Sequence, residues 1–422
     1  MAFNFNFNSE EPIINRLRGD KVIWIVIFLL SMVSIALIYS SSSSLAFKKG
    51  VTNFSFLVSQ CKFVLMGLVT IFICYMIPLG IYRKMSFLLF GISVVFLVLT
   101  PFIGLEINGA KRWFAIGPIQ FQPAEIVKIT LILYLARALE KWEMKTFKEF
   151  FIKILIPIGI VCVFILVGSV STALIMGVMS FTILWIAGVK SSYLWKTIGI
   201  AVSGFLFLIL LNSGVKMINE DIDIFPRFST AVSRMEKFFV KSEIDQSLSA
   251  EEKQKKADET FQEDMARIAI SSVGILGKGP GKSTQRYVLP HPYSDFIYTI
   301  IIEEYGLLGG AFVLFFYIWF FYRCVMMVMK CTKKFSAITA GGLGLMISLQ
   351  ACLHILVNVG IIPVTGHTLP LISLGGTSLI IFSSSFGIIL SVSRTIDADT
   401  TQKKQKLNEF HEIIDERTGE FK

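Results

Sequence analysis

Long apolar runs separated by short polar stretches dominate the chain. A transmembrane helix needs about 20 mostly apolar residues. Runs of roughly this length lie at residues 22–40, 56–81, 85–103, 122–139, 152–167, 170–189, 195–212, 296–322, 336–361 and 369–393. Only Gly168 and Ser169 separate the fifth run from the sixth. The pattern predicts an all-α polytopic membrane protein with about ten transmembrane helices.

The composition supports the same class. Hydrophobic residues make up 54% of the 422 residues, and 38 residues are Phe. A soluble chain of this length cannot bury so much apolar surface. The first run begins too far from the N-terminus, and lacks a small-residue cleavage site, to be a removed signal peptide.

Lys and Arg residues concentrate in alternate loops, which predicts the orientation of the chain. With the N-terminus inside, the inner side carries Arg16, Arg18, Lys21, Arg83, Lys84, Arg137, Lys141, Lys145, Lys148, Lys153, Lys190, Lys196, Arg323, Lys330, Lys333, Lys334 and Arg394. The short outer loops carry only Lys48, Lys49, Lys111 and Arg112. We therefore expect both termini in the cytoplasm. Residues 1–21 would precede a single transmembrane domain at 22–395, and 396–422 would form a flexible charged tail. The formal charge of +10 reflects this topology and does not indicate nucleic-acid binding.

Neither disulfides nor a metal site are expected from the remaining polar chemistry. The six cysteines, at positions 61, 74, 162, 324, 331 and 352, fall in expected spans or on the cytoplasmic side. His354 and His367 have no companions at metal-ligand spacing.

The segment 213–295 is far longer than the other loops, and loops of this length usually carry function. Its charged stretch and the apolar stretch that follows favour a solvated helix and then a segment that touches or re-enters the bilayer. Irregular backbone at that depth must be satisfied by protein or water. Within it, "GKGPGKST" resembles a phosphate-binding loop. Leu276 occupies the place of that motif's first glycine, and Pro280 removes a backbone donor, so no nucleotide site is expected.

Three carboxylates mark the eighth run. Asp295 begins it, and Glu303 and Glu304 would lie ~12 Å deeper in a helix. One interpretation makes Asp295 part of an ordinary helix start, capped by Ser294 and favoured by the helix dipole. Carboxylates inside a span, however, usually face a bundle interior or a wet cavity and find partners.

Partners are available in the fourth run, where Glu125 and Lys128 lie three residues apart on one helical face. They could form a mutual ion pair that stiffens the bundle. They could instead share an outward-open polar cavity with Glu303 and Glu304. Basic groups in the outer segments are Lys111, Arg112, Arg227, Arg234, Lys282 and Arg286. Cations around a carboxylate suit a phosphate-bearing substrate whose bond-making step needs a base.

A third polar stretch, "PVTGHTLPLISLGGTSL", runs from Pro363 to Leu379. Its Thr, Ser, Gly and Pro residues at the mouth of two spans suggest a broken, polar re-entry. The alternative is a tight loop followed by a Gly-rich helix start, since glycine permits close helix packing in membranes.

Three segments resemble signature stretches of the SEDS family of bacterial envelope proteins (shape, elongation, division, sporulation). They are "NGAKRWFAIGPIQFQPAEIVKI", "YVLPHPYSDFIYTIIIEEYGLLGG" and the third polar stretch, and they occur in the family's order. "GKGPGKSTQRYVLP" is closer to the FtsW branch than to the RodA branch, which usually has a longer insertion there. The resemblance covers most of the chain and implies ten spans with a long extracytoplasmic loop between the seventh and eighth.

The resemblance also implies an activity. SEDS proteins polymerise lipid II, an undecaprenyl-pyrophosphate disaccharide-peptide, into peptidoglycan strands. It therefore implies an inverting glycosyltransferase of the bacterial cytoplasmic (inner) membrane, in contact with membrane lipid. The FtsW branch acts in septal wall synthesis, with a class B penicillin-binding protein and other divisome proteins. No cofactor is specified, and the question of a divalent cation stays open.

The family motifs imply roles for individual residues. Asp295 matches the essential aspartate and would act as general base, with Lys128 and Glu125 orienting it. The implied substrate-binding residues are Lys111, Arg112, Trp113, Arg227, Arg234, Gln285, Arg286, Glu303, Glu304, Thr365 and Ser373. The chain departs from the family pattern at Ser169, where an acid is usual, at Ile302, where Gly is usual, and at His367 and Leu374 in the late motif.

Three other functions are compatible with the class of protein: a RodA-type elongation polymerase of the same chemistry, a flippase or transporter of a lipid-linked substrate, and a scaffold for division partners. A carrier needs polar groups along a path through the bilayer. The polar groups of this chain cluster at its outer face, which favours the enzyme.

Overall fold

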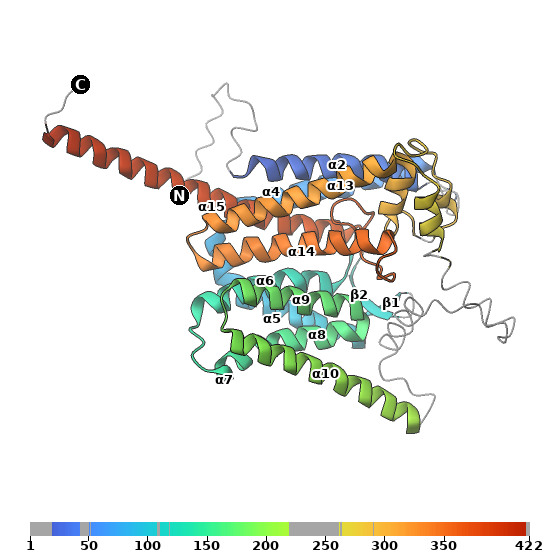
Figure 1. The fold of residues 1–422 in the computed structure, drawn as a ribbon, viewed down its shortest axis with the longest axis horizontal. Helices are drawn as coiled ribbons and strands as arrows, with labels where there is room; N and C mark the ends of the chain where they lie inside the picture. The colour runs from blue at the N-terminus through green and yellow to red at the C-terminus, as the bar shows by residue number, and fades with distance from the viewer. Residues whose placement is uncertain are drawn as a thin grey trace.

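The computed structural model is a bundle of long helices (Figure 1). It describes residues 19–42, 50, 52–107, 110–117, 119–218, 261, 264–289 and 291–418. Within these residues, each expected span overlaps a helix. The helices are α2 (Lys21–Ser41), α4 (Asn53–Met76), α5 (Leu79–Ile103), α6 (Pro123–Lys141), α7 (Phe147–Phe150), α8 (Ile156–Gly168), α9 (Val170–Ile186), α10 (Ser191–Ile218), α13 (Ile297–Lys330), α14 (Lys334–Asn358) and α15 (Thr377–Thr418). A π-helical turn, η1 (Phe151–Leu155), joins α7 to α8 without a break, so these three form one span.

Seven of these spans are long and apolar enough to cross a membrane by length and composition. They are Lys21–Ser41, Asn53–Met76, Leu79–Ile103, Phe147–Gly168, Ile297–Lys330, Lys334–Asn358 and Thr377–Ala398. Helix α9 is apolar but has only 17 residues. It is separate from α8 because Ser169 is extended, with φ −160°, and its side chain accepts a hydrogen bond from the Thr172 amide as the α9 N-cap. The expected polytopic membrane fold is confirmed.

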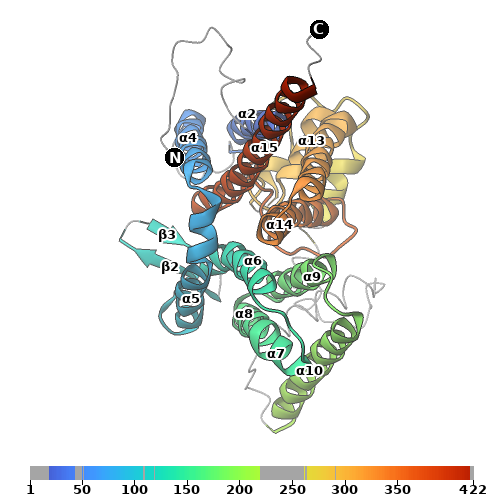
Figure 2. The same ribbon diagram turned by 90° about the vertical axis from the view of Figure 1, so that its left-hand side faces the viewer.

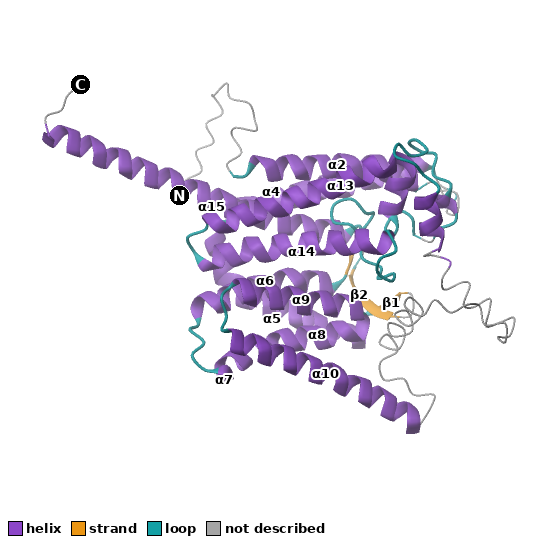
Figure 3. Ribbon diagram, in the orientation of Figure 1, coloured by secondary structure: helices purple, strands orange, loops and turns teal. Residues whose placement is uncertain are grey.

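The loops that connect the helices lie at the two ends of the bundle. The loop between α14 and α15, the start of α13 and the segment between α5 and α6 lie together at the right of Figure 1. The turns that join α6 to α7, α9 to α10 and α13 to α14 lie at the other end (Figure 3). Those residues assigned to the outer face by the sequence analysis that the structure describes therefore share one end, which we call the site end.

A small sheet at the site end departs from the all-helical expectation. Strands β1 (Leu105–Ile107), β2 (Ala110–Ile116) and β3 (Ile119–Phe121) pair antiparallel in the order β1-β2-β3. The segment between α5 and α6 satisfies its backbone groups by pairing with itself. Phe114 and Phe121 anchor the sheet on the ring of Phe96 in α5, with ring centroids 5.5 and 6.0 Å away.

Helices far apart in the sequence form the bundle core. Helix α15 packs along α4, and α14 lies between α13 and α6 (Figure 2). Gly387 allows the close approach of α15 to α4, because a Cβ there would lie 2.6 Å from the carbonyl oxygen of Ile71. Helix α10 lies at the edge of the bundle (Figure 2). It extends to Ile218, past the expected end of the seventh span at 212.

Two boundaries at α15 differ from expectation. The tenth span was expected from residue 369, but α15 begins only at Thr377, after Gly375 and Gly376. The chain after residue 396 was expected as a flexible extension, whereas α15 continues as a helix to Thr418.

Helix α13 contains a break at Gly306, where φ is +70°. The backbone of residues 275–279 docks into this break. The amides of Lys278 and Gly279 donate to the carbonyls of Glu303 and Glu304 at 3.0 and 2.9 Å. The irregular segment expected to touch the bilayer is thus satisfied by protein, through the hydrogen bonds that the helix break leaves free.

Candidate functional site

Asp295 lies in a tight turn immediately before α13. The amides of Ser294 and Asp295 both donate to the carbonyl of His291, at 3.1 and 3.2 Å. The N-cap of α13 is Phe296, which makes no side-chain capping bond. The interpretation of Ser294 as a helix cap is therefore wrong, and the helix start does not explain Asp295.

The side chain of Asp295 is partly buried and faces the loop between α14 and α15. A Cβ on Gly366 would lie 3.7 Å from its Oδ2 atom. Burial raises the pKa of the Asp295 carboxyl above its ordinary value, and the nearby His291 and a hydrogen bond from Ser294 oppose that rise in part. Within the described part of the chain, Asp295 forms no ion pair. Burial is thus the largest influence on the pKa of Asp295.

The loop at residues 359–376 is hydrogen-bonded to the turn that contains Asp295. The Ser373 hydroxyl donates to the carbonyl of Ser294 at 2.8 Å. The amide of Leu374 donates to the carbonyl of Tyr293 at 2.9 Å. Ser373, expected to bind substrate, therefore makes its observed contact with the protein backbone. Thr365 lies in the same loop, and its buried hydroxyl has no hydrogen-bond partner in the described part of the chain.

Glu125 and Lys128 form the expected ion pair on α6, with 2.7 Å between Oε2 and Nζ. Lys128 is 1% exposed. Its ammonium also donates to Oε1 of Gln350 on α14 at 2.9 Å, and it lies over the ring of Phe382 at 5.3 Å. A buried charge with partners on three helices holds those helices in register.

His367 belongs to the loop that faces Asp295, and its two chain neighbours are Gly366, which faces the carboxylate, and Thr368, which bonds to Gln350. Burial and the positive charge of Lys128, followed by His354 and Arg112, lower the pKa of His367 to about 3. The imidazole is therefore neutral at physiological pH. Gln350 connects Lys128 to the same loop, because it accepts from the Lys128 ammonium at 2.9 Å and donates to the carbonyl of Thr368 at 3.1 Å.

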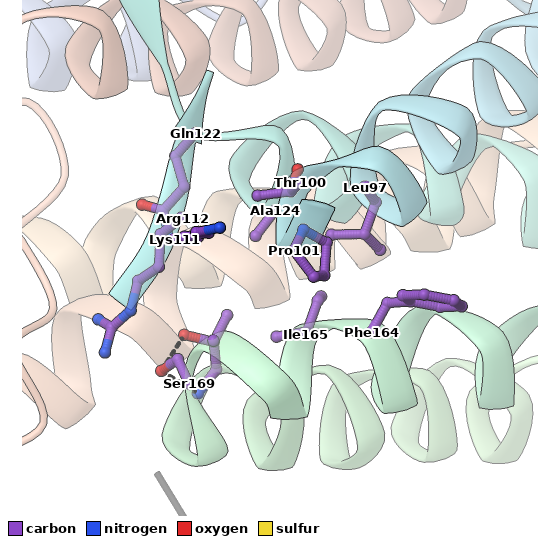
Figure 4. A pocket seen from close by; sticks show the side chains of 12 residues that line it. Leu97, Thr100, Pro101, Lys111, Arg112, Gln122, Ala124, Phe164, Ile165 and Ser169 are labelled. Carbon is purple, nitrogen blue, oxygen red and sulfur yellow. Dashed lines mark hydrogen bonds between the residues drawn. The ribbon is translucent and has the colours of Figure 1, made fainter. Parts of the chain in front are cut away.

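Lys111 and Arg112 of β2 line a pocket at the site end (Figure 4). Its other walls include Pro101 of α5 and Phe164 of α8, and Ser169 lies where α8 gives way to α9. The pocket thus combines cationic groups with an apolar lining.

Ser169, which replaces an expected acid, caps α9 and bonds to the Thr172 hydroxyl at 2.9 Å. Trp113 follows Arg112 on β2 and is partly buried. Arg227 and Arg234 lie outside the described residues.

One of the two alternatives from the sequence, a polar cavity that Glu303 and Glu304 share with the Glu125–Lys128 pair, is wrong. Glu303 is fully buried and accepts hydrogen bonds from the "GKGPGKST" segment. Its donors are Lys278 Nζ at 2.6 Å, the Thr284 amide at 3.0 Å, the Thr284 hydroxyl at 2.9 Å, the Gln285 amide at 3.3 Å, and the Ser283 hydroxyl. The segment that resembles a phosphate-binding loop binds an anion after all, but that anion is a side chain of α13.

Glu304 points to a different neighbour. It accepts a hydrogen bond from the Ser40 hydroxyl at the end of α2. Arg286 donates to the carbonyl of the same Ser40 at 3.1 Å. The structure therefore assigns Glu303, Glu304 and Arg286 to contacts that hold the outer segment against α13 and α2.

Three polar residues of α14 belong to the site and were not anticipated from the sequence. Gln350, His354 and Asn358 are spaced four residues apart and are at most 1% exposed. Asn358 donates to the carbonyl of Asp295 at 3.0 Å, and His354 Nδ1 lies 2.6 Å from the carbonyl of His367. Their polar side chains, at helical spacing inside an apolar span, were the sequence pattern that could have indicated these residues.

The fold and this site define a class: a multi-pass membrane protein whose acidic and basic groups gather at one end of the bundle. A family model described as cell cycle protein, with FtsW, RodA and SpoVE in its name, matches residues 20–397, and the chain belongs to this family.

Curated relatives support the assignment. A probable peptidoglycan glycosyltransferase FtsW from Geobacter sp. (strain M18) is 27% identical over 386 residues, which cover 90% of this chain and 98% of the relative. Another with the same description, from Nitrosococcus halophilus (strain Nc4), is 30% identical over 349 residues, covering 80% and 82%.

Solved structures show the same fold. The rod shape determining protein RodA of Thermus thermophilus matches with a TM-score of 0.63 at 22% identity, over 90% of this chain and 98% of that chain. A chain from a structure described as "Structural coordination of polymerization and crosslinking by a peptidoglycan synthase complex" matches with a TM-score of 0.68 at 22% identity, with the same coverage.

Proposed function

We propose that the protein is a peptidoglycan glycosyltransferase that polymerises lipid II into glycan strands during septal wall synthesis. The names of its curated relatives support the activity and the FtsW role. The observation that carries the proposal is the placement of Asp295. A carboxylate outside the spanning helices, with a raised pKa, lies beside a loop that Gln350 connects to the buried Lys128. A base of this kind is what a sugar hydroxyl needs.

The reaction joins two sugars in one displacement. The 4-hydroxyl of one sugar attacks the anomeric carbon of another, and the bond from that carbon to the diphosphate breaks. The hydroxyl proton passes to the Asp295 carboxylate, and the lipid diphosphate leaves with the bonding electron pair. Because the anomeric configuration changes from α to β, one base suffices and no covalent sugar–enzyme intermediate is required.

The pocket beside β2 suits the leaving group. Negative charge builds on the diphosphate as it departs, and the cationic groups of Lys111 and Arg112 would stabilise it. Leu97, Pro101 and Phe164 give the same pocket an apolar lining suited to the start of an isoprenoid chain. In this proposal, Lys128 and Glu125 orient the loop next to Asp295, and Trp113 and Thr365 contact the sugar.

The setting of the proposal is the bacterial cytoplasmic membrane, with both termini inside and the site end outside. We propose residues 22–395 as one transmembrane domain and 213–295 as its large outer loop. The cross-linking partner would be a class B penicillin-binding protein, together with other divisome proteins. The description of one structural neighbour, which pairs polymerization with crosslinking, supports such a partnership.

Purified protein incubated with lipid II, alone and with its cognate penicillin-binding protein, tests the proposal on a gel that resolves glycan strands. We expect polymer from the wild type and none from Asp295→Asn. A wild-type complex that makes no polymer overturns the proposed activity, and unchanged polymer from Asp295→Asn removes Asp295 as the base. Depletion in the host should block septation, whereas loss of elongation would indicate a RodA-type role.

A further inference from the structure

Helix α14 carries a row of polar side chains through an otherwise apolar span. Gln350, His354 and Asn358 each lie one helical turn apart on one face. All three are buried, and each makes a hydrogen bond to another part of the site end. Polar groups inside a span are expensive unless satisfied, so this row indicates a specific task.

The two ends of the row hold the two halves of the proposed catalytic centre. Gln350 accepts from Lys128 at 2.9 Å and donates to the carbonyl of Thr368 at 3.1 Å. Asn358 donates to the carbonyl of Asp295 at 3.0 Å, and its Oδ1 accepts from the Thr299 amide at 3.0 Å. One helix face thus connects the buried lysine of α6 to the carboxylate turn before α13.

His354 occupies the middle of the row. Its Nδ1 lies 2.6 Å from the backbone carbonyl of His367. A carbonyl oxygen only accepts hydrogen bonds, so Nδ1 must carry the hydrogen, and the neutral ring then has its lone pair on Nε2. That Nε2 atom is buried and has no hydrogen-bond partner among the residues that the structure describes. The one hydrogen bond that the structure gives the His354 side chain is therefore a donation to the loop.

The bonded carbonyl lies at a central point of that loop. Gly366, the residue before it, faces Oδ2 of Asp295, and Thr368, the residue after it, bonds to Gln350. A shift of the His367 carbonyl would move both neighbours. The hydrogen bond from His354 holds the planar peptide unit that joins His367 to Thr368, and Gly366 is bonded directly to His367.

We propose that His354 is a positioning residue, which acts through its Nδ1–H bond to the His367 carbonyl and sets the distance between Asp295 and Lys128. This inference rests on the proposed function, because it concerns the geometry of that reaction. It assigns no contact between His354 and substrate.

Amide replacements separate the two ring nitrogens. His354→Asn retains a donor near the place of Nδ1 and lacks Nε2. His354→Gln places its amide near Nε2 and cannot reach the His367 carbonyl in the same way. His354→Ala removes both. His411→Gln, in the extension of α15 past the bundle, is the matched control for a His→Gln change elsewhere in the chain.

Hydrogen exchange of the full-length protein in nanodiscs tests the inference without any activity. The amide of Leu374 is protected by the carbonyl of Tyr293 and reports how the loop docks on the Asp295 turn. We expect exchange in peptides covering 369–376 to rise about tenfold in His354→Gln and His354→Ala, as for one lost hydrogen bond. His354→Asn and His411→Gln should match the wild type. Equal exchange in all variants overturns the inference, whether or not the protein is a polymerase.

Glycan synthesis from lipid II supplies the second readout. We expect kcat to fall about tenfold in His354→Gln and His354→Ala with KM little changed, and His354→Asn to restore kcat. If His354→Asn were as slow as His354→Ala while its loop exchanged like the wild type, Nε2 would be the important atom and the inference would be wrong. A wild type without polymerase activity would overturn only the proposed function. Should His354→Ala fail to fold, the Asn and Gln variants still decide the question.

Discussion

The side chain of Asn358 donates a hydrogen bond to the backbone carbonyl of Asp295 at 3.0 Å. The last turn of α14 therefore holds the backbone from which the proposed base projects. The carboxylate itself stays available, since no ion pair within the described residues engages it. Two predictions about Asp295 follow from its held backbone and its available carboxylate.

The first concerns the pH dependence of glycan synthesis. Because burial raises the pKa of Asp295, and only the ionised form takes a proton, activity should fall as the pH is lowered through a value above the ordinary ~3.9. His291 opposes that rise, so His291→Gln should move the acid limb to still higher pH. A pH–rate profile of both proteins is the measurement. An acid limb at the ordinary value, unmoved by His291→Gln, would contradict the assignment.

The second concerns the thermal stability of Asp295→Asn. A carboxyl group whose folded pKa lies above its unfolded value favours folding in its protonated form. Raising the pH through the unfolded pKa towards the folded one therefore removes stability. Asp295→Asn should escape this loss and melt at the same or a higher temperature than the wild type at neutral pH, although it makes no polymer. A lower melting temperature at neutral pH would show that the carboxylate stabilises the fold.

The buried Glu125–Lys128 pair should behave as a unit. Lys128→Met leaves the Glu125 carboxylate buried without its cation, so we expect a loss of about 3–5 kcal/mol in the free energy of unfolding. The double variant with Glu125→Gln should recover most of this stability and still lack activity. Denaturant unfolding and the polymerisation assay measure the two effects.

A second ion pair on α6 provides the control for this experiment. Arg137 and Glu140 are also three residues apart, at 2.7 Å, but they are more exposed, and Arg83 also contacts Glu140. Arg137→Met should therefore lower the stability much less than Lys128→Met. Equal losses would show that burial does not determine the effect at Lys128.

Two lysines of one turn should differ in their contribution to stability. Lys278 pairs with the fully buried Glu303, so Lys278→Met should lower the melting temperature and increase amide exchange across 278–285. Lys282, in the same turn, is exposed and is the matched control. Lys282→Met should leave both measurements near the wild type. If the two variants behave alike, the Lys278–Glu303 pair does not hold the turn.

Alanine substitutions at two glycines of the same segment distinguish the effect of a steric clash from the effect of backbone strain. Gly277 and Gly281 have φ values of +77° and +74°, so alanine strains both. A Cβ on Gly277 would also lie 2.4 Å from the carbonyl oxygen of Glu304, whereas one on Gly281 would have no atom of the described residues within 4 Å. Gly277→Ala should therefore destabilise the protein clearly more than Gly281→Ala in a thermal melt. Similar losses would mean that the segment shifts away from α13 easily.

The spans were predictable because hydropathy is a local property of the chain. The start of α15 was placed too early because Leu369 to Leu374 are mostly apolar yet form a loop that covers Asp295. The break at Gly306 could not be predicted, because its freed hydrogen bonds are satisfied by residues 275–279, about 30 positions away. Non-local pairing of this kind leaves no periodic signal.

The site was predictable as far as single residues allowed. Asp295 and the i, i+3 pair on α6 follow from the kind and spacing of the residues. The partners of Glu303 and Glu304 could not be predicted from the sequence. A buried carboxylate requires hydrogen-bond donors, but the sequence does not specify which segment supplies them. His354 was set aside as an isolated histidine, and its role depends on a loop carbonyl that no sequence pattern marks.

The turn around Glu303 has a consequence for the chemistry next to it. Its ammonium, hydroxyl and amide donors converge on one carboxylate, so the turn contains a permanent internal counter-anion. An incoming diphosphate would have to displace a side chain anchored in α13 before it could settle there. Because Glu303 already engages these donors, the turn would not compete with the pocket beside β2, which is the proposed site of the lipid diphosphate.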